Sequence, residues 1–293
     1  MTVPVLLSPE VAEALSAGTP VVALETSIVG QGLPAPHNLR AARDCEAAIR
    51  SEGAVPATIA VIGGRLRAGL ADADLELIAA GASKVSSRDL GPAMTTHAVG
   101  ATTVAATMRV AQMAGIRFFA TGGIGGVHRG HPEDVSADLD ELGRTSVAVF
   151  CAGAKIILDL AATLERLESL SVPVLGYGTD EFPAFYTRTS GLRVSARVGG
   201  DTEAAAVIRR AWESGSRGIV VAVPPPSDLD GAEAIARQAA AELQGVSGAD
   251  VTPRLLARMA ELSGGRSVEL NVDLVVNNAR VAARVAAAFS RAA

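Results

Sequence analysis

The sequence predicts a largely parallel β-sheet with helices on both of its faces. Short runs of β-branched and other apolar residues alternate along the chain with alanine-rich stretches of helical character. The apolar runs end in Gly, Pro or polar residues, as buried parallel strands do. Because parallel strands are joined by right-handed crossovers, this alternation places helices on both faces of one sheet.

The elements follow one another in a regular order. Six apolar runs are predicted as strands, at residues 20–25, 58–64, 116–123, 145–153, 172–177 and 218–226. The predicted helices cover residues 38–51, 101–114, 154–169 and 201–213, and one further helix lies in the polar excursion 228–248. No low-complexity linker interrupts the chain, so we expect a single domain over residues 1–293. Ligand sites in such a sheet gather at the carboxyl ends of strands.

Composition excludes several classes of protein. A net charge of −5 with mixed signs provides no extended basic face, and 3% aromatic residues provide few stacking platforms, so we expect no nucleic-acid partner. Cys45 and Cys151 are too few for a disulfide framework, which favours a reducing compartment. The sequence has no apolar run of about 18 residues and no basic leader before a cleavage site, so we expect a cytoplasmic protein without a membrane partner.

Three residues carry the first chemical signals. Glu25 ends an apolar run, where desolvation favours a protonated carboxyl suited to general acid catalysis; a capping role is the alternative. Lys84 and Lys155 are the only lysines in a chain that otherwise uses arginine. A partly buried lysine can lose its proton and attack a carbonyl, which an arginine cannot do. These rare lysines therefore indicate chemistry that arginine does not supply.

Lys155 is the better candidate for a nucleophile. It lies at the expected opening of the helix 154–169, where desolvation and the positive helix end favour the neutral amine. Asp159 follows at i+4 and either orients the ammonium or forms a helical surface pair. The alternative for Lys155 is a structural lysine whose stem packs along the helix start.

The segment 120–155 combines a glycine turn with histidines and carboxylates. The turn GGIGG at 122–126 allows close backbone approach to a ligand, although it matches no standard phosphate-binding pattern. His128 follows the turn, and Asp134 and Asp138 have the spacing of one helix face. Two such carboxylates suit a hard divalent cation held mostly by water, or a solvated helix start. Ser136 lies between them, where its hydroxyl suits a substrate hydroxyl or phosphate.

Two further positions offer polar groups to a ligand. Residues 100–104 open the expected helix 101–114, and its free N–H groups beside the hydroxyls of Thr102 and Thr103 form an anion site or a simple cap. Asn277 and Asn278 interrupt an apolar run before a helix expected to start at Ala279. Their amides either bind a base or sugar or terminate an element.

A set of motifs occurs in one order along almost the whole chain, from about Pro4 to the final helix. The motifs are ALETSIVGQGLPAPHN, SKVSSRDLG, GATTVAATM, FATGGIGGVHRG, VSADLDEL, CAGAKIILDLAATLE, EFPAFYTRTSG, TPRLLARMAELSGG and LVVNNAR. Together they resemble the pseudouridine-5′-phosphate glycosidase family, also called indigoidine synthase A-like proteins. The resemblance implies a three-layer α/β/α fold, a homotrimer and a bound divalent cation, typically manganese (Mn2+). It also implies reversible hydrolysis of the C–C glycosidic bond of pseudouridine 5′-phosphate to uracil and ribose 5-phosphate.

The same resemblance assigns roles to matching positions. Glu25 matches the proton donor and Lys155 the nucleophile, which forms a Schiff base with ring-opened ribose. Asp134 matches the metal carboxylate. The positions that match substrate contacts are Lys84, Thr103, Val104, His128, Ser136, Ala137, Asp138 and Asn278. The neighbouring Asn277 leaves the last of these assignments open.

This chain departs from the family pattern at two places. The loop HRGHPEDVSADL carries an added histidine and proline, and the residues after Glu25 differ from the commoner form of the first motif. Two other functions fit the same residues. One is an aldolase-like or N-glycosidase activity on another phosphosugar, and the other is a phosphosugar-binding protein in which Lys155 is structural. Cleavage of pseudouridine 5′-phosphate but not of uridine 5′-phosphate would distinguish a C–C glycosidase from the first alternative. Loss of turnover in Lys155→Ala would distinguish an enzyme from the second.

Overall fold

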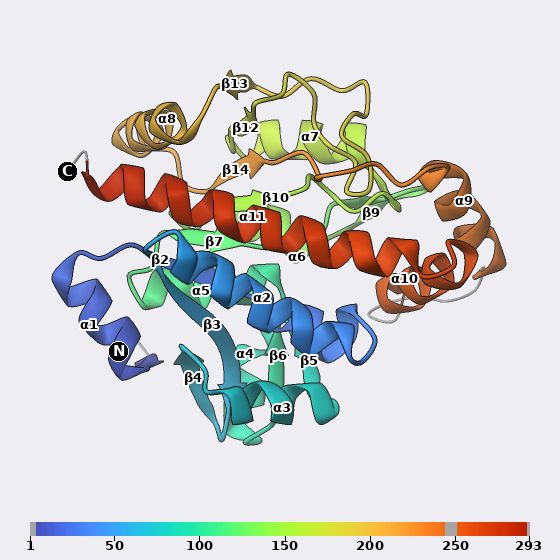
Figure 1. Cartoon of the computed structure of the whole chain (residues 1–293). Helices are drawn as coiled ribbons and strands as arrows, with labels where there is room; N and C mark the ends of the chain where they lie inside the picture. Colours follow the sequence, from blue (N-terminus) through green and yellow to red (C-terminus); the bar gives the residue numbers. More distant parts are fainter. Residues whose placement is uncertain (1–3, 244–250, 292–293) are drawn as a thin grey trace.

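The computed structural model describes residues 4–243 and 251–291, whose strands form one large and one small sheet (Figure 1). The large sheet has the strand order β1-β4-β3-β2-β7-β10-β14-β12-β13, and β6 pairs with β3 and with β5. Its strands are β1 (Leu6–Leu7), β2 (Val21–Leu24), β3 (Val55–Ile62), β4 (Arg65–Ala68), β5 (Ser83–Val85), β6 (Gly100–Thr102), β7 (Phe118–Ala120), β10 (Ala148–Cys151), β12 (Val174–Tyr177), β13 (Ala196–Val198) and β14 (Ile219–Ala222).

The large sheet is mainly parallel. From β3 through β2, β7, β10, β14 and β12 to β13 every neighbouring pair is parallel, whereas β4 and β6 each run antiparallel to β3. The small sheet is antiparallel and consists of β8 (Val127–His128), β9 (His131–Val135) and β11 (Leu158–Asp159). It follows the glycine turn and lies next to the loop that carries Lys155.

The helices lie on both faces of the large sheet. In Figure 1, α11 crosses one face with α2 and α8 beside it. The helices are α1 (Pro9–Ala17), α2 (His37–Ser51), α3 (Asp72–Gly81), α4 (Leu90–Thr95), α5 (Val104–Met113), α6 (Ala137–Leu142), α7 (Leu160–Ser169), α8 (Asp201–Glu213), α9 (Ala232–Glu242), α10 (Val251–Leu262) and α11 (Arg266–Arg291), with short helical turns η1 (Ile28–Gly32) and η2 (Ser87–Asp89).

Alternate residues of each central strand enter two separate cores. Val22 and Leu24 of β2 pack with residues of α2, α8 and α11, whereas Val21 and Ala23 pack with residues of α1, α5, α6 and α7. The neighbouring strands β7, β10 and β14 divide their residues in the same way. A sheet buried on both faces explains why its strands are continuous apolar runs. The three-layer α/β/α fold with a largely parallel sheet is confirmed.

The predicted strands are all present, and the helix 201–213 has the predicted bounds. Two helix starts were wrong. The helix predicted over 101–114 begins at Val104, because residues 100–102 pair as β6. The helix predicted over 154–169 begins at Leu160, because the Asp159 side chain caps it by accepting the Ala162 N–H at 3.0 Å. In the polar excursion, α9 accounts for the expected helix.

The expected break at the two asparagines is also absent. Asn277 and Asn278 both lie inside α11, which continues from Arg266 to Arg291. The prediction that a new helix starts at Ala279 was therefore wrong. Within the ranges 4–243 and 251–291, the helices are too short or too polar to cross a bilayer.

Candidate active site

Glu25 lies directly after β2, in the centre of the large sheet. Two hydroxyl groups donate hydrogen bonds to its carboxylate, Ser27 Oγ to one oxygen and Thr121 Oγ1 to the other. Thr121 follows β7, which is the parallel neighbour of β2. The carboxyl ends of adjacent strands therefore meet at this carboxylate, as expected for a site in a parallel sheet.

The environment of Glu25 favours its protonated form. Burial of the carboxyl raises the pKa of Glu25. The charge of Lys155 and the two hydroxyl donors oppose this effect, and the charge of Asp138 adds to it. A carboxyl whose pKa is raised retains its proton closer to neutral pH, which is what a general acid requires.

Lys155 lies in the loop between β10 and β11, and not at a helix start as predicted. This loop pairs with the glycine turn through backbone bonds: Lys155 N donates to Ile124 O at 3.2 Å, and Ile124 N donates to Gly153 O at 3.1 Å. The pairing extends β7 and β10 beyond their strand ends. It leaves Lys155 partly buried and near enough to Glu25 for its charge to influence that carboxyl.

Asp159, which was expected either to orient Lys155 or to form a helical surface pair, caps α7 instead. The loop between these residues is held by Arg129, which sequence reasoning passed over. Arg129 donates from Nε to Leu158 O and from Nη2 to Ile156 O, both at 2.9 Å. Its position next to His128, directly after the glycine turn, could have marked it as a candidate. Its hydrogen-bond acceptors could not be predicted, because they are backbone carbonyls.

The glycine turn is tightly packed, which explains its composition. A Cβ on Gly125 would collide with the Ser136 hydroxyl and would lie 2.8 Å from Asp138 Oδ2. A Cβ on Gly123 would lie 2.5 Å from the ring of Phe185. Only glycine allows the backbone to approach its neighbours this closely.

Asp138 holds the glycine turn against the start of α5. Its side chain is buried, and its two oxygens accept the N–H groups of Gly125 at 2.8 Å and Ala105 at 2.9 Å. The Ser136 hydroxyl accepts the Asp138 N–H at 3.3 Å and so caps α6, in which Ala137 is the first residue. The Asp138 carboxylate is therefore committed to backbone donors.

The start of α5 was predicted as an anion site or a simple cap. Thr103 does cap the helix, and the protein itself supplies an anion, the carboxylate of Asp138. The second N–H of the helix, that of Ala105, binds Asp138, and the Thr103 hydroxyl accepts the Ala106 N–H at 3.5 Å. Lys84 lies on β5, opposite Ala101 of β6, and Thr103 N donates to Val85 O at 3.0 Å. The sheet thus brings Lys84 to the edge at which Thr103 and Val104 lie.

The predicted pairing of Asp134 with Asp138 on one helix face was wrong. Asp134 lies on β9 and its side chain is 59% exposed, whereas Asp138 is buried in α6. Asp134 approaches His128, with 3.8 Å between Nδ1 and Oδ2. Throughout residues 4–243 and 251–291, no three His, Cys, Asp or Glu side chains gather to hold a metal. Of these two aspartates, only Asp134 offers an accessible carboxylate.

Asn278, rather than Asn277, faces the glycine turn. Its side chain is fully buried, and Nδ2 donates to Thr121 O at 2.8 Å and more weakly to Gly122 O at 3.4 Å. Its Oδ1 is buried and has no hydrogen-bond partner among the described residues. Asn278 therefore supports the residue that donates to Glu25.

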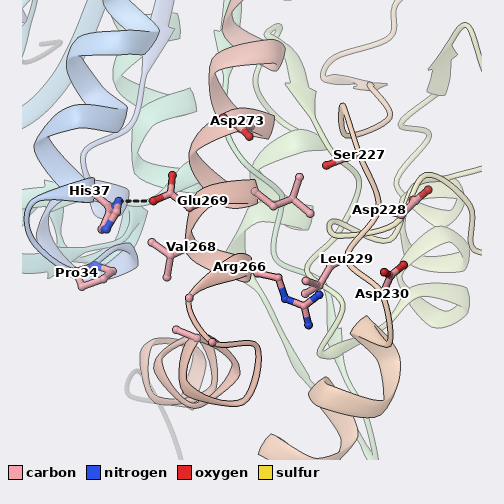
Figure 2. A pocket seen from close by; sticks show the side chains of 14 residues that line it. Pro34, His37, Ser227, Asp228, Leu229, Asp230, Arg266, Val268, Glu269 and Asp273 are labelled. Atoms are coloured by element: carbon pink, nitrogen blue, oxygen red, sulfur yellow. Dashed lines mark ion pairs between the residues drawn. The ribbon is translucent and has the colours of Figure 1, made fainter.

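A separate cavity of about 650 Å3 lies between the start of α2, the loop 227–230 and the first half of α11 (Figure 2). Its ionisable lining includes Asp228, Asp230 and Asp273, and His37 and Glu269 approach to 3.5 Å in its wall. None of the site residues predicted from the sequence lines it, so it is distinct from the site around Glu25 and Lys155.

The fold and the site define a known class. The family model of indigoidine synthase A like proteins matches residues 10–288, and the chain belongs to this family. The pseudouridine-5′-phosphate glycosidase of Symbiobacterium thermophilum is 52% identical over 96% of this chain and 96% of that relative. The resemblance seen in the sequence is confirmed.

Two solved structures share the fold. A prealnumycin C-glycosynthase in complex with ribulose 5-phosphate has a TM-score of 0.89 and 38% identity, covering 98% of this chain and 97% of that chain. An indigoidine synthase A-like protein of Thermotoga maritima has a TM-score of 0.90 and 32% identity, covering 99% and 97%. The first of these shows a phosphorylated pentose bound within this fold.

Proposed function

We propose that this protein is a pseudouridine-5′-phosphate glycosidase that reversibly hydrolyses its substrate to uracil and ribose 5-phosphate. The observation that carries the proposal is the proximity of Glu25 and Lys155, an acid of raised pKa and the sole lysine beside the glycine turn. Relatives about half identical to this chain carry the same name. A C-glycosynthase of the same fold also acts, by its name, on a C-glycosidic bond.

The chemistry explains why an acid and an amine are needed together. A C–C glycosidic bond has no heteroatom leaving group, so the sugar must be activated instead. Glu25 donates a proton to the ring oxygen as the C1′–O4′ bond breaks, and the unprotonated amine of Lys155 forms a bond to C1′. The furanose is then open and covalently attached to the enzyme.

The base leaves in the next step. Uracil C5 takes up a proton and the C1′–C5 bond breaks, while the nitrogen lone pair of Lys155 forms the C1′=N iminium. Water then adds to C1′ and the C–N bond breaks, which releases ribose 5-phosphate and the free amine. One water is consumed for each nucleotide. Hydrolysis of the iminium releases one proton, which returns to Glu25.

The phosphate group is proposed to bind between Lys84 and the start of α5. β5 and β6 bring Lys84 to the edge where this helix begins, and Val104 is its first residue. N–H groups in a first helical turn lack intrahelical acceptors and favour anions. Since Asp138 already occupies the Ala105 N–H, the groups that remain to donate to phosphate are the Val104 N–H and the Thr103 O–H, whose oxygen accepts the Ala106 N–H.

Other predicted contacts are proposed to face the opened sugar. His128 is partly buried beside the Lys155 loop, with which β8 pairs through β11. Asn278 carries a buried oxygen without a partner among the described residues. In the segment Ser136 to Asp138, the Ser136 hydroxyl and the Ala137 backbone are the groups proposed to contact substrate, because the Asp138 carboxylate positions the turn.

A divalent cation, typically manganese, is proposed to bind at Asp134. One exposed carboxylate beside His128 suits a hard cation whose remaining ligands are mostly water. When bound, such a cation supplies positive charge that orders water and polar substrate groups. Asp134 would hold the ion, while Asp138 is excluded as a ligand by its two N–H donors.

The family resemblance also supports a cytoplasmic homotrimer as the working form. The decisive experiment measures uracil release from pseudouridine 5′-phosphate and from uridine 5′-phosphate, with and without manganese. We expect release from the first substrate alone and its loss in Lys155→Ala. Release from uridine 5′-phosphate would indicate an N-glycosidase, and binding without release would indicate a phosphosugar-binding protein.

A further inference from the structure

Lys155 is the first residue of a tight turn. Leu158 N donates to Lys155 O at 2.9 Å, which closes a β-turn over residues 155–158, here called the nucleophile turn. Ile156 and Leu158 are 4% and 2% exposed, and they pack into the two cores on opposite faces of the sheet. The direction of the Lys155 side chain therefore depends on the geometry of this turn.

Arg129 binds the backbone of the nucleophile turn at two points. Its Nε donates to Leu158 O and its Nη2 donates to Ile156 O, both at 2.9 Å. Hydrogen bonds from a charged donor are stronger than those between neutral groups. Because the guanidinium is a rigid planar fork, it also fixes the two carbonyls relative to each other.

The position of Arg129 is itself fixed by a hairpin. His128 of β8 pairs with His131 of β9, so Arg129 and Gly130 alone connect these two strands. Gly130 has a φ of +74°, which a glycine adopts without strain in such a tight connection. The strand β8 also pairs with β11, which begins at Leu158. The hairpin and the nucleophile turn are therefore joined by strand pairing and by the guanidinium.

We propose that Arg129 is a positioning residue for Lys155, because its two bonds hold the nucleophile turn in the geometry that directs the amine at C1′. The proposal rests on the proposed function and adds to it a residue that acts through the backbone of the turn. The same hairpin carries His128 and Asp134, which are proposed to face the sugar and the cation. Arg129 thus links these groups to the nucleophile.

The first test is Arg129→Ala, which removes both bonds. A misplacement of a reacting group by about 1 Å can cost about 10²-fold in rate, so we expect kcat for uracil release to fall about 10- to 100-fold. The KM for pseudouridine 5′-phosphate should change less than about twofold, because the lost interaction affects the chemical step and not substrate binding. The rate at which ribose 5-phosphate forms an adduct that borohydride traps on Lys155 should fall by the same factor as kcat. A rise in KM with kcat unchanged overturns the proposal.

Rescue separates positioning from a general loss of structure. Arg129 is exposed and lines a cavity of about 630 Å3 together with Ile156 and Leu158, so a small cation can enter the space that Arg129→Ala leaves. Guanidinium chloride at millimolar concentration should restore part of the lost kcat, and methylammonium chloride should restore less. Arg129→Lys keeps the charge without the planar fork and should lose less than Arg129→Ala. A loss that neither guanidinium nor Arg129→Lys reduces assigns Arg129 a structural role and overturns the proposal.

Arg209→Ala is the matched control. Arg209 Nη2 also donates to a backbone carbonyl, Phe289 O at 2.6 Å, but Phe289 packs against Phe118 at the amino end of β7. Lys155 lies beyond the carboxyl ends of the strands, on the opposite edge of the sheet. The kcat of Arg209→Ala should equal that of the native protein, with or without guanidinium. Equal losses in the two alanine variants overturn the proposal.

Amide hydrogen exchange tests the nucleophile turn without the reaction. The Leu158 N–H closes the turn and should exchange about tenfold or more faster in Arg129→Ala. The Ile124 N–H, which donates to Gly153 O on the other side of the Lys155 loop, is the internal control and should not change.

Failure of the proposed function gives a different pattern. In that case the native protein neither releases uracil from pseudouridine 5′-phosphate nor forms an adduct with ribose 5-phosphate. The exchange measurement then decides whether Arg129 positions the turn: faster exchange at Leu158 but not at Ile124 supports it, and unchanged exchange at Leu158 overturns it. If Arg129→Ala does not fold, Arg129→Lys gives the same comparison.

Discussion

The Thr121 hydroxyl donates a hydrogen bond to the Glu25 carboxylate across the carboxyl ends of two adjacent parallel strands, although 96 positions separate these residues in the sequence. Asn278, which lies in α11 on one face of the sheet, donates a hydrogen bond to the backbone carbonyl of Thr121. The acid of the site is therefore positioned by the sheet and by α11 together.

This relationship predicts a shift in the pH profile. Hydroxyl donors stabilise the ionised carboxylate, so their removal in Thr121→Val or Ser27→Ala raises the pKa of Glu25 further. The limb of the kcat/KM profile that reports Glu25 should move to higher pH, with activity at the optimum reduced about tenfold. Thr121→Ser retains the donor and should leave the limb in place. An unshifted limb in Thr121→Val would separate this hydroxyl from the function of Glu25.

Glu25→Gln should reduce uracil release about 10²- to 10⁴-fold, because the amide cannot donate the proton of a general acid. It should also change stability in a pH-dependent way. Burial raises the folded pKa of Glu25 above its ordinary value of 4.5, so its stabilising effect is present below that value and is lost as pH rises through the folded pKa. The Tm of Glu25→Gln relative to the native protein should therefore increase as the pH rises above 4.5. A constant difference would argue against the raised pKa.

Lys155→Ala should lose on the order of 10⁴-fold or more in uracil release, because no neighbouring lysine replaces the nucleophile. Borohydride reduction in the presence of ribose 5-phosphate should add a reduced sugar phosphate to the native protein at Lys155 and nothing to the variant. Mass spectrometry of peptides locates the adduct. An adduct on Lys84 instead would reassign the nucleophile.

Asp138→Ala should destabilise the fold by about 2–5 kcal/mol, because the Gly125 and Ala105 N–H groups both lose their buried acceptor. Urea unfolding measures this change. Asp140→Ala is the control on the same helix: Asp140 is only partly buried and pairs with Arg166 at 2.8 Å, so its removal should cost about 0.5 kcal/mol. Equal losses in the two variants would refute the structural role of Asp138.

Asp134→Ala should weaken manganese binding about tenfold or more, as measured by electron paramagnetic resonance of the free ion. Glu133→Ala is the control, because it removes a neighbouring exposed carboxylate on the same strand. If the two variants bind manganese equally, the ion is held elsewhere.

Much of the fold was predictable because its central strands are buried on both faces. Such strands appear in the sequence as continuous apolar runs, and β2, β7 and β10 were all located in this way. The small sheet was not predicted, since β9 has the polar sequence HPEDV and its partners have two residues each. The hydrophobic pattern of a segment does not reveal the pairing of strands that are so short or so polar.

The site was predictable to the extent that rare residue types marked it. Glu25 and Lys155 stood out by position and scarcity, but the start of α7 was misjudged because Ile156, Ile157 and Leu158 continue a helical apolar pattern. Asp138 and Asn278 act by binding backbone groups of segments that are distant in the sequence. Such roles depend on tertiary contacts, which no single segment contains.

The strand order has a consequence for how the molecule matures. β2 pairs with β7, which lies far downstream in the sequence, and β7 pairs with β10, which the Lys155 loop follows. The amine and the carboxyl are therefore brought together only where both of these strand pairs have formed. Covalent labelling of Lys155 by a sugar phosphate would therefore report when the native strand order has formed during refolding. Before that point, the lysine should react with aldehydes no faster than an ordinary exposed lysine.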